Sequence, residues 1–132
     1  MPGDFFDSNI ILYLLDDSAK ADKAAALIAR GGTISTQVLN EVLVNCIRKA
    51  GMSWQEADDF LGGIRAACRV ADLSAQVHDV GRALGERYGF SVYDAMIVAA
   101  ALEAGCSVLL TEDLQHGQSI DQQLLVRDPF RG

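Results

Sequence analysis

The feature that most constrains the fold of this chain is a helical segment with apolar residues on almost every face. The expected helix covers residues 91–105, and residues 95–102 within it form an uninterrupted apolar run. Such a helix has to be buried on all sides, against a sheet or against other helices. The run falls far short of the roughly 18–20 apolar residues that a membrane span needs. We therefore expect a soluble protein with this helix at its centre.

Short strand-like runs alternate with helical patterns along the whole chain. The expected strands are residues 3–7, 33–35, 69–73, 107–111 and 123–127. The expected helices are a short one after Asp7 and then residues 19–30, 38–51, 53–68, 74–88 and 91–105. Strands that alternate with helices favour parallel pairing, with helices on both faces of the sheet. The pattern predicts an α/β fold with three layers, α/β/α, around a mostly parallel central sheet.

Nothing in the sequence divides the chain into two domains. It has 132 residues, of which 50% are hydrophobic, with 2 prolines and no repeat or low-complexity linker. A chain of this length buries roughly two-thirds of the surface that it exposes when unfolded, which is enough for one core without disulfides. We expect residues 1–132 to form a single domain, with Cys46, Cys68 and Cys106 as small buried thiols.

The formal net charge is −7, from 18 acidic and 11 basic residues. Because phosphate binding usually shows as a basic excess, the total charge by itself argues against a nucleic-acid partner. The first residues are acidic and lack the basic and apolar regions of a secretory signal, so a cytoplasmic location is expected. The sequence has no glycine-rich nucleotide-binding motif and no Walker loop, so a dinucleotide or nucleoside triphosphate function has no support.

Four carboxylates fall where a parallel sheet usually binds its ligands, beyond the carboxyl ends of its strands. Asp7 ends the first expected strand, and Asp113 follows the strand at residues 107–111. Glu41 lies on the polar face of the helix after the second strand, and Asp94 lies in the first turn of the apolar helix. Like charges held close together repel and raise each other's pKa. Mg²⁺ or Mn²⁺ removes that cost, because both ions prefer oxygen ligands.

Each acid also has a purely structural explanation. Asp94 has the position of a capping-box carboxylate, which binds a free backbone N–H at the start of its helix. Glu41 is a common residue on solvated helix faces, and Asp7 and Asp113 suit turns between strands and helices. Because all four acids are expected at one edge of the sheet, a shared functional site explains them better than four separate structural roles. His116, close after the last acid, is interpreted as a loop residue, because a site of oxygen ligands does not need it.

These acids lie in four short runs, residues 5–15 (FFDSNIILYLL), 35–42 (STQVLNEV), 93–101 (YDAMIVAAA) and 109–114 (LLTEDL). In that order the runs resemble the acidic motifs of the PIN-domain nucleases. The resemblance spans nearly the whole chain, and the size of the chain is most similar to the VapC-type toxins of bacterial toxin–antitoxin pairs. It implies an endoribonuclease that cleaves RNA with Mg²⁺ or Mn²⁺. It also implies a homodimer and a small cognate antitoxin that inhibits the enzyme.

Carried to this chain, the resemblance implies four residues that bind the metal and carry out catalysis: Asp7, Glu41, Asp94 and Asp113. Asn9 and Thr111 stand at the supporting polar positions beside the first and last acids. Glu112 adjoins Asp113, so the last ligand is one of these two residues or is shared between them. Arg48 and Lys49, at the end of the helix that carries Glu41, are candidates to bind the RNA backbone.

Two other functions are compatible with the same fold class. A phosphohydrolase would usually carry an Asp-x-Asp nucleophile, but Asn9 takes the second place after Asp7. A non-catalytic module would use its apolar helices to bind a protein partner, and residues 39–47 and 54–64 carry more apolar residues than one helix face needs. A metal-dependent ribonuclease accounts best for the four acids. A bound metal then supplies the positive field that the total charge lacks.

Overall fold

The computed structural model describes residues 3–131 of the chain. Within these residues the strands are β1 (Asp4–Phe6), β2 (Gly32–Ser35), β3 (Cys68–Ala71), β4 (Val108–Leu110), β5 (Ser119–Ile120) and β6 (Leu124–Arg127). The helices are α1 (Ser8–Leu12), α2 (Ala19–Ala29), α3 (Thr36–Arg48), α4 (Trp54–Ala67), α5 (Ala75–Tyr88) and α6 (Val92–Glu103), and a 3-10 turn, η1 (Tyr13–Leu15), continues α1. Each expected strand and helix is present, with ends shifted by a few residues.

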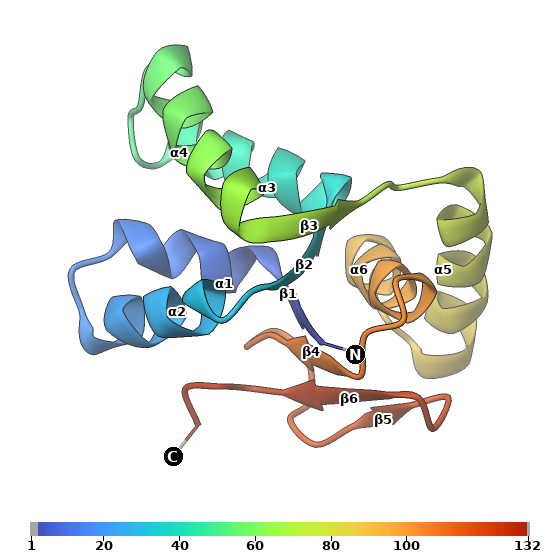
Figure 1. Cartoon of the computed structure of the whole chain (residues 1–132). Coiled ribbons are helices and arrows are strands. Elements are labelled where there is room, and N and C mark those ends of the chain that lie inside the picture. The colour runs from blue at the N-terminus through green and yellow to red at the C-terminus, as the bar shows by residue number, and fades with distance from the viewer. Residues whose placement is uncertain (1–2, 132) are drawn as a thin grey trace.

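The strands form one sheet in the order β3-β2-β1-β4-β6-β5. All neighbouring pairs are parallel except β5 with β6, which is antiparallel. Figure 1 shows α1 and α2 on one side of the sheet and α5 and α6 on the other, with α3 and α4 at its β3 end. The predicted three-layer α/β/α fold with a mostly parallel sheet is therefore confirmed.

The apolar helix α6 is buried as its composition requires. All residues from 95 to 101 are buried, and α6 packs against α5 on the face turned away from α1 and α2 (Figure 1). Two glycines of α5 allow the close approach, because a Cβ at Gly81 would stand 2.7 Å from the Met96 sulfur, and one at Gly85 would touch the Ala95 Cβ at 3.5 Å. Gly89, with a φ of 76°, ends α5.

The one strand that sequence reasoning missed is β5. It has two residues and pairs with β6 through a short turn in which Asp121 and Gln122 adopt positive φ values of 51° and 59°. Asp121 is held in this left-handed conformation by Tyr88, whose hydroxyl accepts from the Asp121 N–H at 3.0 Å and donates to its carboxylate at 2.9 Å. This hairpin covers the edge of the sheet next to β6.

Two serines that precede helices differ in their hydrogen bonds. Ser53 and Glu56 form the reciprocal bonds of a capping box at the start of α4. Ser18 stands at the start of α2, but its hydroxyl donates to Asp16 at 3.0 Å and caps no N–H group. Cys46, Cys68 and Cys106 are buried free thiols, as expected. Among residues 3–131, no helix has both the length and the apolar composition needed to cross a membrane.

Candidate active site

Asp7 is the most buried of the candidate acids, with 3% of its surface exposed. Its backbone N–H donates to Leu110 O at 3.1 Å, so the chain keeps its pairing with β4 one residue beyond the end of β1. Asp7 is also the N-cap of α1, and its Oδ1 accepts from the Ser8 N–H at 2.7 Å. The strand and the helix together fix this carboxylate at the carboxyl end of the sheet, where parallel folds bind ligands.

Thr111 joins Asp7 to the loop after β4. Its hydroxyl, fully buried, donates to Asp7 Oδ2 at 2.8 Å and accepts from the Asp113 N–H at 3.0 Å and from Asn9 Nδ2 at 3.3 Å. Asn9 Nδ2 also donates to Asp113 Oδ2 at 3.1 Å. A hydroxyl has one proton and two lone pairs, so Thr111 uses its full bonding capacity here. Four of the candidate residues, Asp7, Asn9, Thr111 and Asp113, are thus joined in one set of hydrogen bonds.

The negative charge at this point is not neutralised. Burial raises the pKa of Asp7 to about 6, the bonds from Thr111 and Ser8 oppose that shift, and the charges of Asp113 and Glu41 add to it. None of the ion pairs formed within residues 3–131 includes Asp7, Glu41, Asp94 or Asp113. The carboxyl edge of the sheet therefore holds acids that form no ion pair with a basic side chain of the described residues.

Glu41 and Asp94 stand on two different helices, and of these two only Glu41 is close enough for its charge to raise the pKa of Asp7. Glu41 lies half-buried in the second turn of α3, and its Oε2 accepts from Gln37 Nε2 at 3.2 Å. Gln37 Nε2 also donates to the carbonyl of Tyr93 at 2.9 Å, which links α3 to the first turn of α6. Sequence analysis missed Gln37, although its position four residues before Glu41 places both side chains on one helix face.

The capping explanation of Asp94 holds only in part. Ser91 caps α6 by accepting from the Asp94 N–H at 3.3 Å. The return bond, from the Ser91 N–H to the Asp94 carboxylate, does not form among the described residues, whereas the corresponding bond of Ser53 and Glu56 does. The Asp94 carboxylate is therefore free of the role that a capping box would give it.

Glu112 and Asp113 have different partners. Glu112 accepts from the Tyr13 hydroxyl at 2.6 Å and from Lys20 Nζ at 2.8 Å. Burial raises the pKa of Glu112, but the bonds from Lys20 and Tyr13 outweigh it and leave that pKa below its usual range. Glu112 raises the pKa of Lys20 most strongly, and Tyr13 adds to the effect. Asp113 is bonded to Asn9, and its charge is among those that raise the pKa of Asp7.

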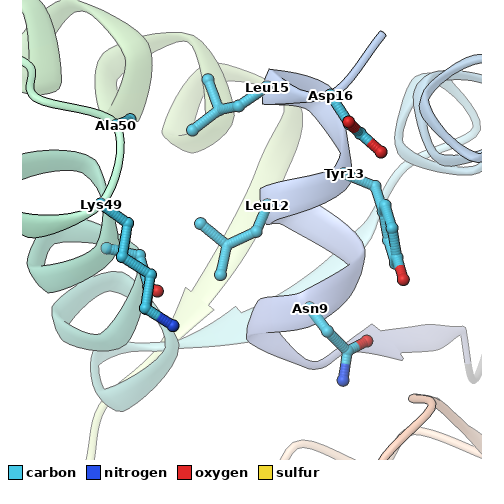
Figure 2. Close-up of a pocket in the computed structure, with 8 residues that line it drawn as sticks. Asn9, Leu12, Tyr13, Leu15, Asp16, Lys49 and Ala50 are labelled. Atoms are coloured by element: carbon cyan, nitrogen blue, oxygen red, sulfur yellow. The ribbon is translucent and has the colours of Figure 1, made fainter. Parts of the chain in front are cut away.

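The two basic candidates differ in their surroundings. Lys49 lines a cavity of about 360 Å³ between α3 and the α1–η1 segment, together with Asn9, Leu12, Tyr13, Leu15, Asp16, Asn45 and Ala50. Figure 2 shows Lys49 and Leu12 on opposite sides of this cavity, with the amino group of Lys49 directed toward the end where Asn9 lies. Asn9 belongs both to the cavity and to the acid cluster, so the two are continuous. Arg48 is exposed and does not line the cavity.

His116 has a structural role in its loop. Its Nδ1 accepts from the Asp128 N–H at 3.0 Å, which ties the loop after β4 to the residues that follow β6. This contact agrees with its interpretation as a loop residue.

The donors at the acid cluster have the chemistry of a hard-cation site. They are carboxylate oxygens and the amide oxygen of Asn9, which suit Mg²⁺ or Mn²⁺. Asn9 Oδ1 is a buried acceptor without a partner among the described residues, so it has the capacity to accept from a water of a hydrated ion. Within residues 3–131, no three Asp, Glu, His or Cys side chains come together closely enough to hold a metal ion by themselves. The residues fit an ion that keeps several waters.

The sequence model of the PIN domain matches residues 5–118, a segment that contains all four candidate acids. No curated protein sequence matches the chain.

Several solved structures share the fold. A toxin–antitoxin complex from Klebsiella pneumoniae has a TM-score of 0.75 at 19% identity, with 97% of this chain and 98% of that chain covered. A DNA-bound VapBC from Salmonella typhimurium has a TM-score of 0.72 at 21% identity, with 98% and 99% covered. VapC20 from Mycobacterium tuberculosis, described as a sarcin–ricin loop cleaving toxin, has a TM-score of 0.68 at 21% identity, with 84% and 90% covered.

Proposed function

Because the chain belongs to the PIN-domain family, we propose that it is a metal-dependent endoribonuclease, which hydrolyses phosphodiester bonds in RNA. The observation that carries this proposal is the buried carboxylate of Asp7, fixed at the carboxyl end of β1 and raised in pKa by burial and by the charges of Asp113 and Glu41. Burying a charge without an oppositely charged partner destabilises the fold, so a buried carboxylate that is kept at this position is expected to have a function. A divalent cation is the partner that this donor set fits.

In this proposal Asp7, Glu41, Asp94 and Asp113 hold Mg²⁺ or Mn²⁺. A bound divalent cation supplies Lewis acidity toward phosphate and a water of lowered pKa. Thr111 and Asn9 hold Asp7 and Asp113 in place through the bonds described above. Gln37 holds Glu41 beside the first turn of α6. Lys49, which lines the cavity beside Asn9, attracts the negatively charged RNA backbone, and the neighbouring Arg48 adds a second positive charge at the end of α3.

We further propose that the chain acts as the toxin of a toxin–antitoxin pair in the cytoplasm, as a homodimer and under the control of a small antitoxin. The similar fold of the toxin–antitoxin complexes from Klebsiella pneumoniae and Salmonella typhimurium supports the pairing. The surface supports a protein partner, because Glu41 lines a cavity of about 400 Å³ with the exposed apolar side chains Val44, Leu73 and Tyr93. Exposed apolar groups gathered at one place are typical of protein interfaces.

The experiment that tests the proposal is cleavage of a generic oligoribonucleotide with Mn²⁺, with and without a chelator. We expect cleavage by the unmodified protein, loss of cleavage with the chelator, and loss in Asp7→Asn and Asp94→Asn. Asp58→Asn is the matched control, because Asp58 is exposed on α4, away from the acid cluster. Cleavage that persists in Asp7→Asn or Asp94→Asn would overturn the site assignment. Release of phosphate from small esters without RNA cleavage would favour a phosphohydrolase.

RNA binding provides an additional test. The protein carries a net charge of −7, so the metal has to supply part of the field that attracts RNA. We expect the affinity for RNA, and not only its cleavage, to fall when the metal is removed by a chelator. An RNA affinity that is the same with and without the chelator would contradict this explanation of the charge.

A further inference from the structure

The loop after β4 presents two neighbouring carboxylates to one helical segment. Asp113 Oδ2 accepts from Asn9 Nδ2 at 3.1 Å, and Glu112 Oε1 accepts from the Tyr13 hydroxyl at 2.6 Å. Asn9 and Tyr13 are four residues apart on α1 and η1, so they lie on one face, with Cβ atoms about 5–6 Å apart. The two acids therefore bind to successive turns, and the carboxylate of Glu112 is held about one turn away from the acid cluster.

Lys20 provides the second hold on Glu112. Its Nζ lies 2.8 Å from Glu112 Oε2 and donates to the Tyr13 hydroxyl at 3.1 Å. The same ammonium lies over the rings of Tyr13 and Phe130, at 4.9 and 5.3 Å from their centroids, and these rings meet edge to face at 4.9 Å. The Lys20 ammonium, carried by α2, is thus held by contacts with three other segments: η1, the loop after β4 and the C-terminal segment. Both oxygens of Glu112 are engaged by this arrangement.

We propose that Lys20 and Tyr13 are positioning residues that hold Glu112 away from the acid cluster and so make Asp113 the last metal ligand. The inference rests on the proposed function for the presence of the metal. A glutamate has a longer side chain than an aspartate, and a free Glu112 would reach the cluster from one helical turn away. Sequence alone leaves Glu112 and Asp113 as equivalent candidates, and these contacts distinguish them.

The competing explanation is that Lys20 binds RNA directly. Its side chain is 45% exposed, which leaves it accessible to a phosphate. Its ammonium, however, is already bonded to a carboxylate and a hydroxyl and lies over two aromatic rings, so binding RNA would require it to leave these partners. A measurement made without RNA separates the two explanations, because only the positioning role changes the metal site itself.

The test measures, by calorimetric titration of Mn²⁺, how much Asp113→Asn weakens Mn²⁺ binding. The variant with Asp113→Asn is compared with its parent protein in each of three backgrounds. In the unmodified background, we expect Asp113→Asn to weaken Mn²⁺ binding about tenfold or more. In a Lys20→Met background, we expect a loss of less than about threefold, because Glu112, then held by Tyr13 alone, is able to replace the missing ligand. In a Lys20→Met, Glu112→Gln background, the loss should return to about tenfold, because the replacement is gone.

Lys23→Met is the matched control. Lys23 is exposed on the same helix, three residues further along, and forms no ion pair within residues 3–131. It changes the net charge equally, and Asp113→Asn should cost as much in this background as in the unmodified protein. Tyr13→Phe removes one hold on Glu112 and keeps the ring beside Phe130, so it should reduce the cost of Asp113→Asn by a smaller amount than Lys20→Met. This variant keeps the test valid if Lys20→Met does not fold.

Two results would overturn the inference. One is an equal cost of Asp113→Asn in the unmodified, Lys20→Met and Tyr13→Phe backgrounds. The other is a reduced cost in Lys20→Met that remains after Glu112→Gln is added. If the unmodified protein binds no Mn²⁺, the inference and the proposed function both fail. If it binds Mn²⁺ with the expected pattern and does not cleave RNA, only the proposed function fails.

Discussion

Asp7 and Asp113 belong to one set of hydrogen bonds between β1, β4 and α1, whereas Glu41 and Asp94 stand on two helices that Gln37 connects. In the first half, the ends of adjacent parallel strands place the acids, and the buried hydroxyl of Thr111 fixes them. In the second half, one amide bridges a carboxylate and a backbone carbonyl. In the proposed site, the half with Asp7 and Asp113 is therefore organised by more hydrogen bonds than the half with Glu41 and Asp94.

The largest expected effect follows from removing the charge at the centre of the organised half. Asp7→Asn should reduce RNA cleavage by about a thousandfold or more, a loss typical of removing a principal electrostatic group. The variant keeps the shape of the side chain and removes a buried charge, so the metal-free fold should become more stable. Single-turnover cleavage and thermal unfolding measure the two effects. Asp4→Asn, on the same strand, should change neither, and an inactive but destabilised Asp7→Asn would contradict this explanation.

The pH dependence of stability is the next effect in size. The pKa of Asp7 is about 6 in the folded protein and about 3.8 when it is not perturbed, so between these values the folded state binds the extra proton. The stability that this proton contributes is complete below about pH 3.8 and is lost as the pH rises through about 6. Without metal, the unmodified protein should therefore lose about 2–3 kcal/mol relative to Asp7→Asn from pH 4 to pH 7.

Denaturant unfolding of both proteins in chelator, at several pH values, measures this difference. The contribution of other titrating groups cancels in the comparison, since both proteins contain them. Saturating Mn²⁺ should reverse the trend at neutral pH, because the metal binds the ionised carboxylate and stabilises only the unmodified protein. A difference between the two proteins that does not vary with pH would show that Asp7 is not the group that titrates.

Thr111→Val tests the hydrogen bonds of the organised half. Valine has nearly the same shape as threonine but forms none of the three bonds that join Asp7, Asn9 and Asp113. We expect Mn²⁺ affinity to fall about tenfold, as for other residues that orient metal ligands. Thr33→Val, at a buried threonine of β2, is the matched control and should leave Mn²⁺ affinity within about twofold. Equal losses in both variants would mean that the effect is general destabilisation.

Gln37→Leu tests the other half and should have the smallest effect. It removes the bridge between Glu41 and Tyr93 and keeps the volume of the side chain. Since this half is less organised, we expect kcat to fall only about threefold, close to the value of a single neutral hydrogen bond. Steady-state kinetics on an oligoribonucleotide measures the effect. If Gln37→Leu lowers kcat more than Thr111→Val does in the same assay, the comparison between the two halves would be reversed.

The parts of the molecule that sequence predicts are those with local signals. The alternation of strands and helices is visible because each helix shows its own period, and α6 shows its burial directly in residues 95–102. The close contact of α5 with α6 at Gly81, where a Cβ would stand 2.7 Å from the Met96 sulfur, also has a local mark in the sequence, the glycines at positions 81, 85 and 89. The sequence does not predict the β5 hairpin, because the strand has only two residues. Its turn also uses Asp121 and Gln122, without the Asn-Gly signal of such turns.

The parts that sequence does not predict are contacts between distant segments. The separate roles of Glu112 and Asp113 follow from Lys20 and Tyr13, which lie about a hundred positions away in the chain. Gln37 gains its role from the carbonyl of Tyr93, and a backbone carbonyl leaves no mark in a sequence. Asn9 and Thr111 are predicted as supporting residues from their place in a motif, but the bonds between them depend on the pairing of β1 with β4.

The most direct test of the central claim is a calorimetric titration of Mn²⁺ into the unmodified protein and into Asp7→Asn, near pH 7.5 and without RNA. The claim is that the buried carboxylate at the end of β1 anchors a divalent cation. It predicts saturable binding by the unmodified protein, release of protons on binding, and a loss of affinity of about tenfold or more in Asp7→Asn. Equal affinities in the two proteins, or no binding in either, would contradict it.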